Sequence, residues 1–203
     1  MIDNRKDFSD ILLNSYSQYY DIHHFPETER PLLARCDFHM EKGSYFLLKR
    51  NMTWMAKCHE YCYIVSVPHL TLDMYREYEK YVYDHGMTLI DPKSGDHMST
   101  YLTLLVVCDS CDKDALRALK RCHIHKDFRF ALDGWMDFHT ALVCMSDHTI
   151  MTNMSGHDQK HFLKELIRLP ADAAPSARAA KSSETTDSPI DDPATAGAAK
   201  AAV

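Results

Sequence analysis

The chain has few of the features that mark common ligand sites. Of its 203 residues only six are glycines, and they stand apart, so no GxGxxG motif or P-loop is present to cradle a phosphate. Basic residues are outnumbered, 23 Lys and Arg against 29 Asp and Glu, which gives a formal net charge of −6. No apolar run approaches the roughly 20 residues of a membrane-spanning helix. We therefore expect no nucleotide bound through a glycine loop, no nucleic-acid partner and no membrane.

The chain also lacks the apolar core of a secretory signal near its start, where the residues are polar. This predicts a cytoplasmic protein. The seven cysteines are an odd number, and in a reducing compartment we expect thiols, small buried hydrophobes or metal ligands instead of a disulfide framework.

The hydrophobic pattern predicts an α+β fold, with a mostly antiparallel sheet of six to seven strands and about four helices. The expected helices span residues 4–20, 72–85, 113–122 and 155–168. The expected strands span residues 36–40, 45–54, 61–67, 99–108, 128–132, 135–145 and 149–153, with turns at 41–44 and 57–60. Residues 1–169 are predicted to form a single globular domain, and the Ala/Pro/Ser-rich residues 170–203 a disordered tail.

Residues 99–108 are apolar at positions that point to both faces of a strand, which predicts the centre of the sheet. We expect a core that includes the following residues: Val106, Val107, Phe128, Phe130, Trp135 and Leu142. Each half of the chain also contains a Trp-Met pair, a second strand and a helix, which suggests two β-β-α halves.

A metal site is suggested by Cys108 and Cys111, two residues apart, followed by Cys122 and His125 with the same spacing. Three thiolates and one imidazole are a ligand set for tetrahedral zinc, and His123 or His97 could replace His125. A helix over residues 113–122 would be about 15 Å long and would hold the two pairs apart. The alternative is that the cysteines pack as small hydrophobes.

Other catalytic patterns are weaker. The CxxC before a helix suggests redox chemistry, but Asp109 and Asp112 disfavour a thiolate there. His157 and His161 have the spacing of the zinc-protease motif HExxH, but Asp158 stands where the catalytic Glu is required. We favour the simpler interpretation, a polar first helical turn that Asp158 caps.

A wider pattern resembles a known group of sequences. It comprises Lys126-x-Phe128-x-Phe130-x3-Gly134-Trp135-Met136-x-Phe138, then Asp147, then Thr152-Asn153-x2-Gly156. It is similar to uncharacterised small cytoplasmic proteins of anaerobic Gram-positive bacteria. The resemblance implies a bacterial protein and supplies no activity and no catalytic residue.

Tyr75, Tyr78 and Tyr81 share one predicted helix, and tyrosine favours interfaces, so a homodimer through this helix is expected unless the rings are core. Whether the protein is an enzyme stays open from sequence alone. The leading hypothesis is a non-enzymatic binding or interaction domain without a cofactor. The alternative is a zinc-binding or thiol-dependent protein that uses the cysteine and histidine cluster.

Overall fold

A computed structural model describes residues 4–26, 31–45 and 52–169, and in 41–45 and 52–56 only the backbone is considered. The helices are α1 (Arg5–Tyr16), α2 (Leu72–Leu89), α3 (Lys113–Arg121) and α4 (Gln159–Arg168), with a short 3₁₀ helix η2 (Pro92–Ser94). The strands are β1 (Asp21–His24), β2 (Leu32–Tyr45), β3 (Met52–Leu70), β4 (His97–Cys111), β5 (His125–Asp127), β6 (Trp135–Cys144) and β7 (Thr149–Thr152).

The seven strands form one mixed sheet in the order β1-β2-β3-β4-β6-β5, with β7 also paired to β6. β4 lies at the centre and pairs in parallel with β3 and with β6. The remaining pairings are antiparallel. The predicted α+β class, with four helices and a mostly antiparallel sheet, is therefore confirmed.

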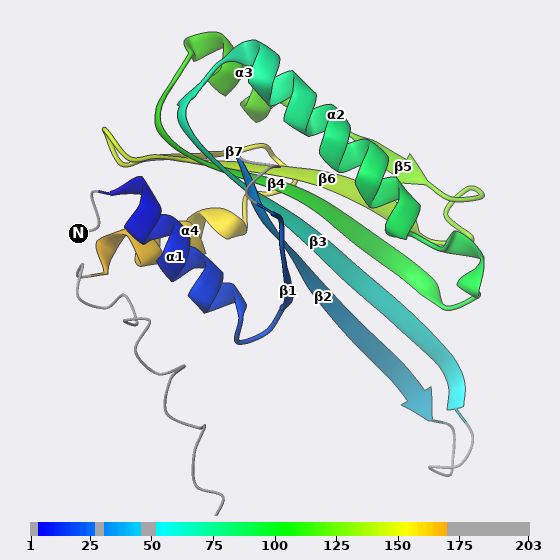
Figure 1. Cartoon of the computed structure of the whole chain (residues 1–203). Coiled ribbons are helices and arrows are strands. Elements are labelled where there is room, and N and C mark those ends of the chain that lie inside the picture. The colour runs from blue at the N-terminus through cyan, green and yellow to red at the C-terminus, as the bar shows by residue number, and fades with distance from the viewer. Residues whose placement is uncertain (1–3, 27–30, 46–51, 170–203) are drawn as a thin grey trace, which may run out of the picture.

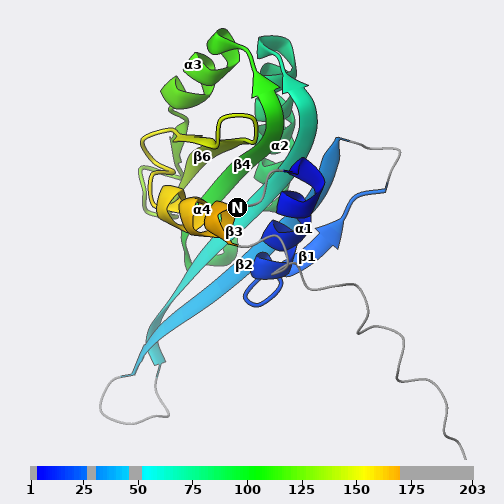
Figure 2. The same cartoon turned by 90° about the vertical axis from the view of Figure 1, so that its left-hand side faces the viewer.

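Helices cover both faces of this sheet (Figures 1 and 2). α2 and α3 pack on one face, over a core that includes Tyr63, Leu104 and Leu119. α1 and α4 pack on the other face, over a core that includes Phe8 and Leu105. Every residue of β4 from 102 to 108 is buried, as expected for a strand covered on both sides.

Local signals in the sequence set where the helices begin. The Asn4 side chain accepts a hydrogen bond from the backbone N–H of Lys6 (2.8 Å), and that of Thr71 accepts one from Met74 (3.3 Å). Each satisfies a donor that a helix start would leave without a partner.

Two predicted turns were wrong. Residues 41–44 belong to β2 and residues 57–60 belong to β3, which runs without interruption for 19 residues and passes Pro68. The long β2–β3 hairpin extends past the helices in Figure 1. Pairing on both sides keeps the polar residues 57–60 in the sheet, because β2 pairs with them along one edge of β3 and β4 pairs with them along the other.

The predicted strand over 128–132 was also wrong. Arg129, Phe130 and Ala131 have positive φ values of 48°, 57° and 63°, which belong to a left-handed turn. Phe130 was expected in the core, but its side chain is 97% exposed because the turn projects it into solvent. Phe128, just before the turn, is buried as expected.

Both halves of the chain contain an antiparallel hairpin followed by a helix, β2-β3-α2 and β6-β7-α4. The two helices nevertheless lie on opposite faces of the sheet, so the halves are not equivalent in space. The predicted tail, residues 170–203, lies outside the described residues. Among the described helices, none has the length and apolarity needed to cross a membrane.

Candidate functional site

Three cysteine side chains meet where β4 and β6 end. Cys108 and Cys144 are direct partners across the parallel strands, and Cys111 is the last residue of β4. Their three sulfur atoms all lie within 4.8 Å of one another. A tetrahedral zinc ion with bonds of about 2.3 Å holds its sulfur ligands roughly 3.8 Å apart. Small side-chain movements would therefore bring the three thiols to the spacing that zinc requires.

Within this thiol cluster (Cys108, Cys111 and Cys144), the local environment favours the protonated form of Cys108 and of Cys111. Burial raises the pKa of Cys108, and the neighbouring Cys144 and Cys111 raise it further. Burial also raises the pKa of Cys111, with smaller contributions from Cys144 and Asp147. Thiolates crowded in a buried site repel one another, so a cation that neutralises them is the natural partner.

Polar groups surround the thiol cluster on one side. The Cys144 thiol donates to the Asp109 carbonyl oxygen (3.4 Å), and its sulfur lies 3.4 Å from Ser146 Oγ. Asp147 is close enough for its charge to affect Cys111. Three thiols fill three positions of a tetrahedron, and a carboxylate oxygen or a water could complete it.

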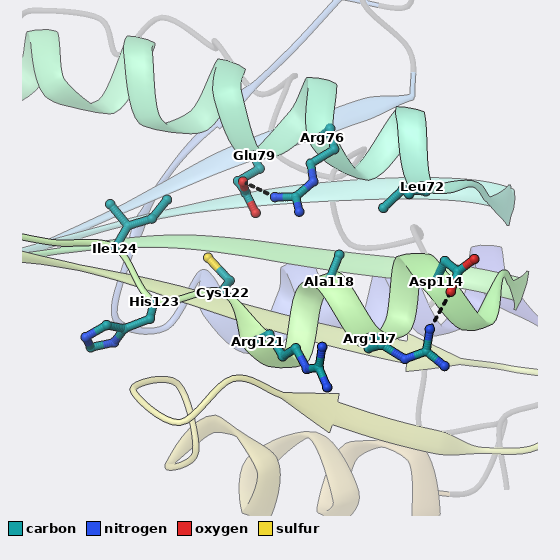
Figure 3. A pocket seen from close by; sticks show the side chains of 10 residues that line it. All are labelled: Leu72, Arg76, Glu79, Asp114, Arg117, Ala118, Arg121, Cys122, His123 and Ile124. Atoms are coloured by element: carbon teal, nitrogen blue, oxygen red, sulfur yellow. Dashed lines mark hydrogen bonds and ion pairs between the residues drawn. The ribbon is translucent and has the colours of Figure 1, made fainter.

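Cys122, predicted as the third thiolate ligand, lies elsewhere. It follows α3 and lines a groove of about 460 Å³ between α2 and α3, where its sulfur points toward the α2 side (Figure 3). Burial raises the pKa of Cys122 to about 11, and the Glu79 carboxylate contributes to this rise. Cys122 therefore belongs to the helix–helix contact and not to the thiol cluster.

The groove in Figure 3 contains three arginines, but two of them are paired within their own helix. Arg76 donates to Glu79 (2.9 Å) and Arg117 donates to Asp114 (2.6 Å). This balance of charges leaves only Arg121 to attract an anion, which is weak support for an anion site.

His125, predicted as the fourth ligand, is on β5. Its Nδ1 lies 2.6 Å from Asp137 Oδ1 and its Nε2 lies 3.2 Å from Asp127 Oδ1. Both ring nitrogens thus have carboxylate partners. The hydrogen bond with Asp137 raises the pKa of His125.

The substitute histidines also have other roles. His97 Nδ1 lies 2.7 Å from the Asp133 carbonyl oxygen and its Nε2 lies 2.9 Å from Thr100 Oγ1, whereas His123 is exposed at the end of the groove. His157 precedes α4, so it does not share a helix with His161. The metal-protease spacing is therefore absent from α4.

Of the three tyrosines proposed for a dimer contact, Tyr75 is fully buried in the core. Tyr81 is 39% exposed. The homodimer stays a prediction, and only the outer part of α2 could serve it.

Sequence reasoning found Cys108 and Cys111 but missed Cys144. The missing information was the register of β4 against β6, which places Cys144 beside Cys108. The only signal in the sequence was that each of two apolar strands ends in a cysteine.

The chain was compared with known proteins. No curated protein and no solved structure matches it. One family model matches residues 4–165 and covers α1 to most of α4. This agrees with the resemblance to uncharacterised proteins. The chain belongs to the family described as a domain of unknown function, DUF8052.

Proposed function

We propose that this protein is a non-enzymatic binding domain that holds a zinc ion through Cys108, Cys111 and Cys144. The observation that carries the proposal is the convergence of three sulfur atoms within 4.8 Å at the ends of two neighbouring strands. Zinc is favoured because it accepts several thiolates in tetrahedral geometry and needs no redox partner.

The electrostatics support a binding role over a catalytic one. Reactive cysteines have lowered pKa values, which populate the nucleophilic thiolate at neutral pH. Cys108, which is buried, and Cys111, which is partly buried, have raised pKa values because removal from water disfavours the thiolate. Zinc binding would displace their protons and stabilise the junction of β4, β6 and α3.

The test is the zinc content of protein purified under reducing conditions, measured by elemental analysis. We expect one zinc per chain in the wild type and a loss of zinc in Cys144→Ser. Cys122→Ser and His125→Gln are matched controls, because both residues were predicted as ligands and both lie outside the thiol cluster.

Substitution with Co²⁺ gives a second measurement, since thiolate ligands produce intense charge-transfer absorption. We expect this absorption in Cys122→Ser and its loss in Cys144→Ser. Protein without bound zinc that also fails to bind added zinc or cobalt would refute the proposal. Loss of metal in Cys122→Ser and His125→Gln, with Cys144→Ser unaffected, would instead support the ligand set predicted from sequence.

A further inference from the structure

A second hollow lies on the face of the sheet opposite the groove between α2 and α3. It is located above β3, where the end of α1 meets the start of α4. Its volume is about 560 Å³, within the range of small-molecule sites. It is lined by Ser15, Tyr16, Gln18, Tyr19, Tyr20, Glu60, Asp158, Gln159 and Phe162. The lining thus combines four aromatic rings with two carboxylates and contains no lysine, arginine or histidine.

Glu60 is the central charge of this hollow. Its carboxylate accepts hydrogen bonds from the Tyr20 hydroxyl (2.7 Å), the Thr103 hydroxyl (2.9 Å) and the Gln159 amide (3.2 Å). All three donors are neutral, and Glu60 forms no ion pair with any residue that the structure describes. A partly buried carboxylate fixed by neutral donors keeps a negative field that a bound cation would neutralise.

The negative charge of Glu60 also affects the pKa values of neighbouring groups. Burial raises the pKa of Tyr20, and the Glu60 charge raises it further. His139 lies near enough to interact with Glu60, but burial lowers its pKa and so favours the neutral ring. Asp158 also borders another hollow lined by Lys160, so Glu60 and not Asp158 carries the argument.

The aromatic rings form walls set at angles to one another. Tyr16 is tilted by 56° to Tyr20, with ring centroids 4.7 Å apart, and by 74° to Phe162, with centroids 5.8 Å apart. Neither pair is stacked face to face. Tyr19 adds a ring that is 75% exposed at the rim. Rings arranged around a space beside a carboxylate provide the quadrupole and the charge that bind an organic ammonium ion.

We propose that the hollow between α1 and α4 binds a small organic cation, with Glu60 as its counter-ion and with Tyr19, Tyr20 and Phe162 around its alkyl groups. An anion would be repelled by Glu60 and Asp158. A bare metal ion would gain nothing from the aromatic walls. The site is on the other face of the sheet from the thiol cluster and does not depend on it.

The test compares a cation with a neutral molecule of the same shape. Choline and 3,3-dimethylbutan-1-ol are such a pair, and isothermal titration calorimetry measures the binding of each to the full chain. We expect choline to bind about three- to thirtyfold more tightly, the range that corresponds to one cation–aromatic contact. Butylammonium and methylguanidinium extend the test to cations that donate hydrogen bonds.

Two variants locate the binding. Tyr19→Ala removes a mostly exposed ring without opening the core, and Glu60→Gln removes the charge. Each should weaken cation binding, whereas Phe130→Ala, which removes a ring that is 97% exposed on a distant turn, should not. If Glu60→Gln lowers the melting temperature, the comparison of Tyr19→Ala with Phe130→Ala still decides the question. The proposal is refuted if none of the three cations binds at millimolar concentration, if choline and its neutral analogue bind equally, or if Tyr19→Ala binds like Phe130→Ala.

Discussion

The two faces of the sheet are packed in different ways. On one face, the 18-residue α2 and the shorter α3 extend over an apolar core that includes Phe128 and Phe138. On the other, α1 and α4 cover an apolar core built from the later parts of β3, β4 and β6. The earlier part of that face carries Glu60, Tyr101, Trp135 and His139, which are all partly exposed. Polar and aromatic side chains thus gather where helical cover ends, and this boundary holds the hollow for a cation.

The thiol cluster shows the contrasting case. It lies on the face under α2 and α3, at the end of the buried strands, where Cys108 and Cys144 are part of the apolar core. A ligand there would act mainly on stability. A ligand in the hollow between α1 and α4 would bind at the surface and exchange with solvent.

The largest effect should come from deleting matched leucines on the two faces. Leu12 of α1 and Leu119 of α3 are both fully buried. We expect Leu12→Ala and Leu119→Ala each to lower the free energy of unfolding by about 2–5 kcal/mol, since each removes buried methyl groups and leaves a cavity. Urea unfolding followed by circular dichroism measures both. A loss below about 1 kcal/mol in only one variant would show that one helical layer contributes little to the fold.

Zinc bound to the thiol cluster should stabilise the fold from the face under α2 and α3. At a free zinc concentration one hundred times its dissociation constant, we expect the free energy of unfolding to rise by about 2.7 kcal/mol. Urea unfolding with zinc and with excess chelator measures this difference. The difference should disappear in Cys144→Ser and persist in Cys122→Ser. An equal response of both variants would place the effect outside the thiol cluster.

A third prediction concerns the turn that leads into β6. Gly134 has φ of +80°, and an added Cβ would lie 2.5 Å from both His97 Nδ1 and the Met98 carbonyl oxygen. We expect Gly134→Ala to lower the free energy of unfolding by about 1–3 kcal/mol through backbone strain and this clash. Gly95 also has φ of +80° but nothing within 4 Å of its Cβ position. Gly95→Ala should therefore lower the free energy of unfolding through backbone strain alone. Equal decreases in the two variants would contradict the clash at Gly134.

The smallest expected effects are two opposite dependences of stability on pH, one from His125 on β5 and one from His139 on β6. Asp137 raises the pKa of His125, so this pair stabilises the fold fully below the unfolded-state pKa of about 6.5 and less as pH rises through the folded-state value. Burial lowers the pKa of His139, so its contribution is present above about pH 6.5 and is lost as pH falls through its folded-state value.

Nuclear magnetic resonance titration of the two imidazoles checks these directions. Because the His125 side chain is 40% exposed, its contribution to stability should stay below about 1 kcal/mol. Asp137→Asn should lower the pKa of His125. An unchanged value would show that the 2.6 Å contact does not persist in solution.

The helices and the central strand could be predicted from sequence because their signals are local. Apolar residues at helical spacing indicate α1, the cap at Thr71 marks the start of α2, and the apolar run of β4 marks a strand covered on both sides. The strand predicted over 128–132 failed because three consecutive non-glycine residues adopt positive φ, which propensity does not anticipate.

The candidate sites were harder to predict because their residues are distant in the chain. Cys144 joins Cys108 through strand register, and Glu60 meets Tyr20 and Gln159 only after α1 and α4 pack on the same face. Regular spacing in the sequence favoured Cys122 and His125, yet spacing does not determine which side chains a sheet brings together.

The parallel pairings of β4 also bear on the order of assembly. β2 and β3 are joined directly and can form a hairpin early, whereas β3 with β4 and β4 with β6 must each wait for a helical connection to close. We therefore expect Cys108 and Cys144 to come together late in folding. A zinc ion at this point would bind a nearly finished chain, and it would slow unfolding more than it accelerates folding.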